Sequence, residues 1–273
     1  MFDLLIIRIV ILLLAIAFAA YTDYKSGYIY NWLNYSLAII GLILNIFTYS
    51  FISNLNIILG CVAIFVVGYI IYYFGKIGGG DIKLFIAINL MLPYYYNQPF
   101  VLFVLLFSCL FSVVIVSLIY TFKLFSKIRF TTKFLKQKIS SIIKSVLIFV
   151  FFCLFMHYSI KLGSLPIYFY YSLIPIFLGL FIMIFQDEIK KYIYLQKLPL
   201  EKIEDGDVIA TEHISKTLLE KLKLGQRQVI EEEDLKRFKK LKIKSLPIYY
   251  NLPKFGPYIL LGTIFTLIFL SLI

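Results

Sequence analysis

The sequence lacks the patterns that identify many soluble enzymes and metal-binding domains. Its three cysteines, Cys61, Cys109 and Cys153, lie far apart inside apolar runs and form no CxxC pair. This excludes a zinc ribbon and a disulfide framework, so we interpret the cysteines as small buried apolar residues. The chain has no GxSxG segment and only two histidines, and nothing in it predicts a metal site or a cofactor.

Acidic residues are scarce outside one segment. Of the 15 Asp and Glu residues, 12 lie between positions 187 and 255, and the others are Asp3, Asp23 and Asp81. With 27 Lys and Arg residues, the formal net charge is +12. No RNA- or DNA-binding signature accompanies this charge, and the lysines flank apolar runs. We therefore expect the lysines to face anionic lipid and not nucleic acid.

Apolar sequence is abundant instead. Hydrophobic residues make up 61% of the chain, whereas soluble domains contain about 45–50%. Apolar runs long enough to cross a bilayer recur, which predicts an all-α polytopic membrane protein. We predict about eight transmembrane helices, at residues 4–22, 33–52, 55–75, 81–96, 99–121, 142–161, 166–186 and 256–273.

Positive charge sorts the predicted loops into two sets. Residues 122–144 contain seven Lys and Arg, and residues 187–255 contain 15, whereas the alternate loops contain one at most. By the positive-inside rule the lysine-rich loops are cytoplasmic, and both termini then lie outside. We therefore expect a multi-pass protein of the plasma membrane.

Four regions follow from this pattern. They are a membrane core at 1–121, a basic cytoplasmic loop with an extra transmembrane hairpin at 122–186, a small α+β cytoplasmic subdomain at 187–255, and the last transmembrane helix at 256–273. In the subdomain, the DGD turn at 205–207 precedes a predicted short strand. The segment EEEDLKRFKKLK (231–242) predicts a short helix with acids in its first turn and lysines in its last.

Asp23 and Asp81 are the residues that indicate a chemical function. Ionisable groups within a membrane body are costly to hold there, which makes them functional candidates. Asp23 ends the first predicted span and Asp81 begins the fourth, and the parity of the spans places both on the cytoplasmic side. Two facing carboxyl groups can share a proton, so that one acts as a base and the other as an acid. Such a pair can activate water against a peptide carbonyl.

The segment GGGD at 78–81 predicts how a peptide reaches this pair. Its glycines carry no Cβ, so a substrate backbone can approach closely and unusual φ values are allowed. The alternative is structural, a glycine loop in which Asp81 caps a helix. Nearby, Asn31 either caps the second span or orients Asp23. Lys83 either lowers the pKa of a nearby acid or binds lipid headgroups.

Four segments together resemble a known family. GGGD fits the GxGD pattern of the membrane aspartyl proteases, and DYKSGYIYN (23–31) resembles a run in which Asn follows Asp by eight residues, here with Tyr30 replacing Pro. GGDIK (79–83) resembles a G-[GA]-D-x-K run, and GDVIA (206–210) resembles a GDxxA run. The chain most closely resembles the archaeal preflagellin and prepilin peptidases, which are class III signal peptidases.

The resemblance implies an aspartic-type endopeptidase with a core of six spans and its site at the cytoplasmic face. Its substrates would be archaellin or pilin-like precursors, each with a short basic leader, a glycine near the cut and then an apolar helix. Methyl transfer is not implied, because the CxxC domain of the bacterial enzymes is absent from the sequence. The implied site residues are Asp23 and Asp81 as catalytic groups, Gly78, Gly79 and Gly80 at the substrate, and Asn31 and Lys83 in support.

Two other functions fit parts of the pattern. A transporter whose carboxyl pair relays protons or binds a cation predicts acids near the membrane midplane and an inverted repeat, and the sequence has neither. A non-enzymatic platform for secretion or pilus assembly would tolerate the loss of both aspartates. If the chain is a peptidase, EDGD (204–207) or EEED (231–234) is expected to attract the basic leader; alternatively these segments are a solvated turn and a helix start.

Overall fold

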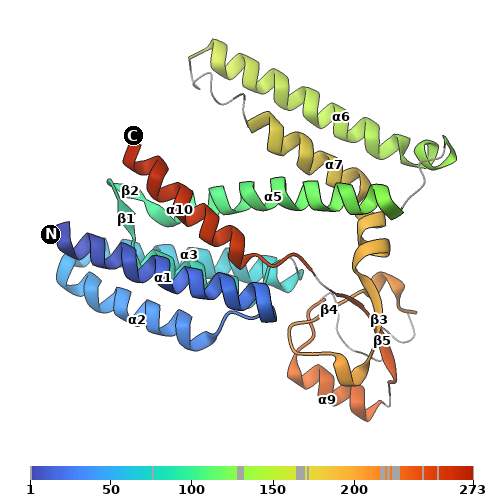
Figure 1. Ribbon diagram of the computed structural model, residues 1–273, viewed down its shortest axis with the longest axis horizontal. Helices are drawn as coiled ribbons and strands as arrows, with labels where there is room; N and C mark the ends of the chain where they lie inside the picture. Colours follow the sequence, from blue (N-terminus) through green and yellow to red (C-terminus); the bar gives the residue numbers. More distant parts are fainter. Residues whose placement is uncertain are drawn as a thin grey trace. The chain divides into compact units, whose positions relative to one another are not determined.

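The chain forms two compact units, one of residues 1–111 with 196–273 and one of residues 112–195 (Figure 1). The computed structural model describes residues 2–75, 77–127, 132–163, 170, 172–215, 219, 222, 228–241, 243–250 and 252–272. Helices dominate both units, as the sequence predicted. They are α1 (Phe2–Ser26), α2 (Asn31–Thr48), α3 (Phe51–Tyr73), α4 (Gly79–Met91), α5 (Phe100–Lys127), α6 (Thr132–Lys161), α7 (Leu173–Ile189), α9 (Glu232–Lys240) and α10 (Gly256–Leu272).

Five of the described helices, α1, α2, α3, α5 and α6, contain segments long and apolar enough to cross a membrane. This confirms a mostly helical protein with several potential spans. The other three predicted spans correspond to shorter helices, since α4 has 13 residues and α7 and α10 have 17 each. The count of eight spans therefore stays a prediction.

The predicted span at 81–96 was too long. Helix α4 ends at Met91, and the chain then forms a small hairpin of β1 (Tyr94–Tyr95) and β2 (Gln98–Pro99). Pro93 explains the stop, because proline disfavours the helical conformation in the residue before it. At about 1.5 Å per residue, α4 is roughly 20 Å long, shorter than a hydrocarbon core of about 30 Å.

Helix α4 lies at the centre of its unit, where it packs against α2 and α3, while α1 packs against α10. Most of its side chains are buried, including Leu84, Phe85 and Ile88. Glycine lets α2 approach it closely, because a Cβ on Gly41 would lie 2.6 Å from the carbonyl carbon of Leu90. The short helix is therefore surrounded by protein and does not depend on lipid contact.

The carboxyl end of α4 is held by a buried arginine. Arg8 of α1 is only 3% exposed, and its Nη1 donates to Asn45 Oδ1 at 2.8 Å and to the Met91 carbonyl at 2.9 Å. The Asn45 amide in turn donates to the Leu90 carbonyl at 2.8 Å. A cation at this position also complements the negative end of the helix dipole.

The polar segment that follows α7 forms a small sheet with one helix, and its standing as a separate subdomain stays a prediction. Its sheet has the order β3 (Leu195–Pro199), β5 (Ser245–Tyr249), β4 (Val208–Ile209). Strands β4 and β5 are antiparallel, with Ile209 opposite Ile248. Phe238 of α9 is fully buried in the same hydrophobic cluster. The predicted strand after the DGD turn and the predicted helix at EEED are both present.

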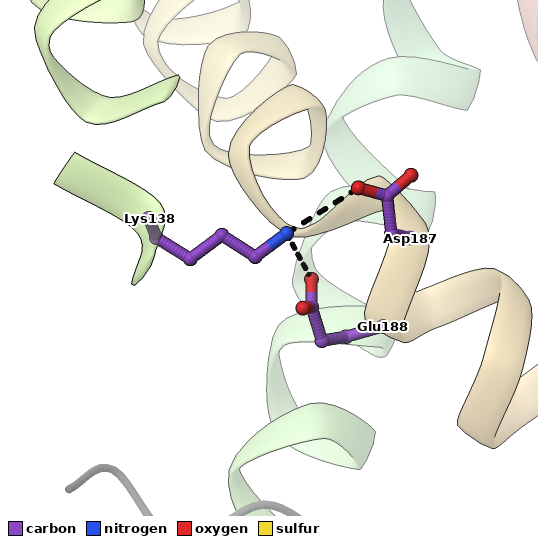
Figure 2. A network of polar contacts seen from close by, with 3 residues as sticks. All are labelled: Lys138, Asp187 and Glu188. Atoms are coloured by element: carbon purple, nitrogen blue, oxygen red, sulfur yellow. Dashed lines mark hydrogen bonds and ion pairs between the residues drawn. The ribbon is translucent and has the colours of Figure 1, made fainter. Parts of the chain in front are cut away.

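The second unit contains α6 and α7, which lie against each other. Lys138 of α6 joins them: its Nζ lies 2.9 Å from Glu188 Oε2 and 3.4 Å from Asp187 Oδ2 (Figure 2). The predicted basic loop at 122–144 is largely helical, because α5 continues to Lys127 and α6 begins at Thr132. Residues 128–131 of that loop lie outside the described residues.

Candidate active site

Asp23 lies in the last turns of α1 and is 7% exposed. Helix α1 ends three residues later, and Gly27 follows with a φ of 77° while its N–H donates to the Asp23 carbonyl at 2.8 Å. Only glycine adopts this left-handed conformation readily, so Gly27 turns the chain away directly after the carboxylate. The side chain of Asp23 accepts a hydrogen bond at Oδ2 from the backbone N–H of Gly256, at 2.8 Å.

Asp81 lies in the first turn of α4 and is also 7% exposed. Its Oδ2 accepts a hydrogen bond at 3.1 Å from the backbone N–H of Gly78, which occupies the position just before the helix. Asp81 therefore satisfies a free N–H of the helix end from inside the first turn. It does not itself occupy the cap position, so the structural interpretation of Asp81 is correct only in part.

The structure brings the two carboxyl groups near each other. Gly80 packs against the loop after α1, since a Cβ on it would lie 3.2 Å from the Ile29 Cβ. The carboxylates of Asp23 and Asp81 are close enough for each charge to repel the other. Among the described residues, no hydrogen bond joins the two groups, and neither carboxylate forms an ion pair. Lys254 is close enough to Asp23 to attract it electrostatically.

The three glycines before Asp81 are not equivalent. A Cβ on Gly78 would lie 2.9 Å from Asp81 Oδ2. Glycine at this position therefore lets the Asp81 carboxylate lie close to the backbone that binds it. Gly79 has the most room, because a Cβ on it would come no closer than 3.7 Å to any neighbouring atom. None of the three glycines has a positive φ, so the structure does not use the freedom in φ that glycine allows. Their contact with substrate stays a prediction.

Asn31 and Lys83 bind each other, with the Lys83 ammonium donating to Asn31 Oδ1 at 2.7 Å. This contact is exposed and joins the start of α2 to the first turns of α4. The capping interpretation of Asn31 was wrong: α2 begins at Asn31 itself, and the position before it is Tyr30, which makes no side-chain cap. The pair therefore links the two helices near the site without touching either carboxylate.

The sequence analysis did not identify two residues, Asn34 and Gly256, that lie near the carboxylates in the structure. Asn34 is 1% exposed, and its Nδ2 donates to the Gly80 carbonyl at 3.3 Å. It lies one helical turn after Asn31, a spacing that places both on one face of α2. Gly256 begins α10 ahead of Pro257, and such a Gly-Pro step is a helix-start signal. Nothing in the sequence indicates that this helix start meets Asp23.

Comparison with known proteins agrees with the resemblance seen in the sequence. Residues 9–117, less than half of the chain, match the sequence model of the type IV leader peptidase family. A protein of Methanothermobacter thermautotrophicus named prepilin peptidase EppA is 34% identical over 100 residues, which are 33% of this chain and 24% of that protein. The match thus spans about a quarter of that relative's length. No solved structure matches the chain significantly.

The matched residues contain both carboxylates and the three glycines at 78–80. They also contain the whole of α2 and α4, which pack against each other at the site. The α+β subdomain and α10 lie outside the matched residues. The predicted resemblance is confirmed for this part of the chain: residues 9–117, with Asp23 and Asp81 among them, are related to the type IV leader peptidases.

Proposed function

We propose that this protein is a membrane aspartyl endopeptidase that removes the short basic leader from archaellin or pilin-like precursors at the cytoplasmic face of the plasma membrane. The carrying observation is that two buried carboxylates, Asp23 at the end of α1 and Asp81 at the start of α4, lie within reach of each other's charge. Each accepts one backbone N–H, which leaves acceptor capacity on both for a water and a shared proton.

The chemistry needs no covalent intermediate. The ionised carboxyl of the pair removes a proton from a water molecule, whose oxygen attacks the scissile carbonyl carbon, while the protonated carboxyl donates its proton to the carbonyl oxygen. In the second step the pair donates its proton to the leaving nitrogen and takes one from a hydroxyl of the diol intermediate, the C–N bond breaks, and a carboxyl and an amine result with the pair again holding one proton. Because the two groups titrate together, the acid and base roles belong to the pair and not to single residues.

The surroundings of the site suit a basic leader. The hydroxyl of Tyr28, in the loop after α1, donates to the Asp205 carbonyl at 2.8 Å, so the EDGD turn lies beside this loop. Burial, and then the charges of Glu204, Asp205 and Asp207, raise the pKa of Tyr28. The acidic turn therefore creates a negative potential next to the loop that follows Asp23. The EEED segment is less available to bind a leader, because its Asp234 is fully buried at the start of α9.

The transporter alternative finds less support in the geometry. Both carboxylates lie at helix ends, in the last turns of α1 and the first turn of α4. A relay or cation site near the midplane of a bilayer would place them in the middle of spanning helices. The position of both carboxylates at helix ends supports a site that meets a substrate chain at the membrane interface.

Cleavage of a precursor by membranes that contain the protein tests this function. The precursor carries a basic leader, a glycine and an apolar helix, and mass spectrometry identifies the new termini. Wild type should produce one cut at the leader boundary, and membranes with Asp23→Asn or Asp81→Asn should produce none. Cutting by both variants at the wild-type rate would rule out the peptidase and reopen the transporter and platform alternatives. Charge reversal of Glu204 and Asp205 should raise KM for basic leaders only.

A further inference from the structure

The hydrogen bond to Asp23 comes from a distant part of the chain. Gly256 is 233 residues away from Asp23 and lies outside the residues that match the leader peptidase family. Its N–H is at the first position of α10, where no earlier turn of the helix supplies an acceptor. The Asp23 carboxylate takes that place at 2.8 Å, in a buried contact.

The contact requires glycine for steric reasons. A Cβ on Gly256 would lie 2.9 Å from both Cβ and Oδ2 of Asp23, and 3.3 Å from the Ala20 Cα. Real Cβ atoms do not approach other atoms this closely, so any larger residue must displace the Asp23 side chain or separate α1 from α10. Because Ala20 contributes backbone here, α1 cannot yield by a side-chain rotation alone.

The residues before Gly256 reach both carboxylate-bearing helices. Lys254 Nζ donates to the Tyr24 carbonyl in the last turn of α1 at 3.1 Å. The ring of Phe255 lies 6.2 Å from the ring of Phe85, which follows Asp81 by one turn of α4. The segment 254–256 therefore touches the end of α1 and the first turns of α4 at the same time.

We propose that Gly256 is a positioning residue for Asp23. Its N–H holds Oδ2, which fixes the orientation of the carboxyl group and leaves Oδ1, without a hydrogen bond among the described residues, for water and Asp81. Lys254 and Phe255 keep the start of α10 in register with α1 and α4. This inference rests on the proposed role of Asp23 in peptide cleavage, and it adds α10 as a third element of the active site.

Kinetics with a matched pair of glycine variants test the proposal. Gly256→Ala should lower kcat at least tenfold and leave KM within twofold, because the carboxylate is displaced while the substrate surface is unchanged. The control is Gly262→Ala on the same helix, where a Cβ would lie 2.2 Å from Ser108 Oγ, away from Asp23. It should lower thermal stability but keep kcat per folded protein within twofold. Equal effects of both variants on kcat would overturn the proposal.

A measurement on the wild-type protein does not depend on how these variants fold. The chain has two Phe-Gly steps, Phe74-Gly75 and Phe255-Gly256, so labelling with carbonyl-¹³C Phe and ¹⁵N Gly gives one amide signal for each. In nanodiscs, the Gly256 amide proton should shift with pH, and Asp23→Asn should abolish this shift. Gly75, whose N–H donates to the Tyr72 carbonyl, is the internal control. A Gly256 signal that does not respond to pH would contradict the hydrogen bond.

The two experiments separate the inference from the function beneath it. If Asp23→Asn membranes still cut the precursor, the proposed function fails regardless of Gly256. If Asp23→Asn abolishes cutting while Gly256→Ala cuts at the wild-type kcat, the peptidase stands and the positioning role is wrong.

Discussion

The two ends of α4 hold their charged neighbours in opposite ways. At the carboxyl end, the Arg8 guanidinium donates to a side-chain carbonyl and a backbone carbonyl, and also to Thr48 Oγ1 at 3.0 Å. At the amino end, Asp81 has one backbone donor and a second carboxylate, Asp23, close enough to repel it. The first end is built from complementary partners, whereas the second holds like charges together.

This difference separates a stabilising cluster from a reactive one. Removing one partner of a buried, hydrogen-bonded charge leaves the other groups without a partner, so breaking the hydrogen bonds of Arg8 is expected to cost stability. Like charges held at close range repel and destabilise a fold, and they are typical of sites where protons move. The comparison therefore predicts that variants at the two ends of α4 affect different measurements.

Asp81→Asn should produce the largest effect, a loss of cleavage of about a thousandfold or more, the range expected when an acid–base group is removed. Thermal stability in detergent should stay close to wild type, because the asparagine oxygen can still accept from the Gly78 N–H. Precursor cleavage and a thermal melt measure the two quantities. A variant that keeps a tenth of the wild-type rate would place Asp81 among the structural residues.

Arg8→Met should show the reverse behaviour. Removing the guanidinium leaves the Asn45 and Met91 oxygens without their donor, which costs about 3 kcal/mol. The thermal midpoint should fall clearly, while kcat per folded protein stays within a factor of three. Lys25→Met, at the exposed opposite end of the same helix, is the control and should leave the midpoint nearly unchanged. A selective loss of kcat in Arg8→Met would remove the contrast between the two ends.

Lys83→Met should have a smaller effect on cleavage, a reduction of roughly twofold to fivefold. The Lys83–Asn31 contact is exposed, and exposed polar contacts contribute little. Asn31→Ala should give a similar reduction, and the double variant should be no worse than either single one, because both remove the same contact. Strictly multiplicative losses would show that the two residues act separately.

Lys138→Met should have the smallest effect on cleavage of the precursor. Its ion pairs with Asp187 and Glu188 join α6 to α7 in the second unit (Figure 2). The Lys138–Glu188 pair is largely buried, with side chains 12% and 14% exposed. We therefore expect a loss of stability of about 3 kcal/mol and an unchanged cleavage rate. Asp187 and Glu188 are adjacent acids, but a lysine neutralises them, unlike Asp23 and Asp81. A large loss of cleavage here would extend the functional machinery beyond the first unit.

The structure brings Asp23 and Asp81 near each other, as the parity of the predicted spans indicated, whereas their catalytic role stays a prediction. Asp23 and Asp81 were found because acids are rare in apolar runs, and span parity placed them on one side. The end of α4 was missed because hydropathy continues past Met91 and only Pro93 marks the stop. The sequence predicted neither the Gly256 hydrogen bond to Asp23 nor the hydrogen bonds of Arg8 at the other end of α4, because both join residues far apart in the chain.

The most direct test of the central claim is a comparison of four purified proteins in nanodiscs: wild type, Asp23→Asn, Asp81→Asn and the double variant, each acting on a precursor with a basic leader. If the two carboxyl groups act as one unit, each single variant should fall to the background rate, and the double variant should be no slower than either. If either single variant retains substantial cleavage, the two aspartates do not form a catalytic pair.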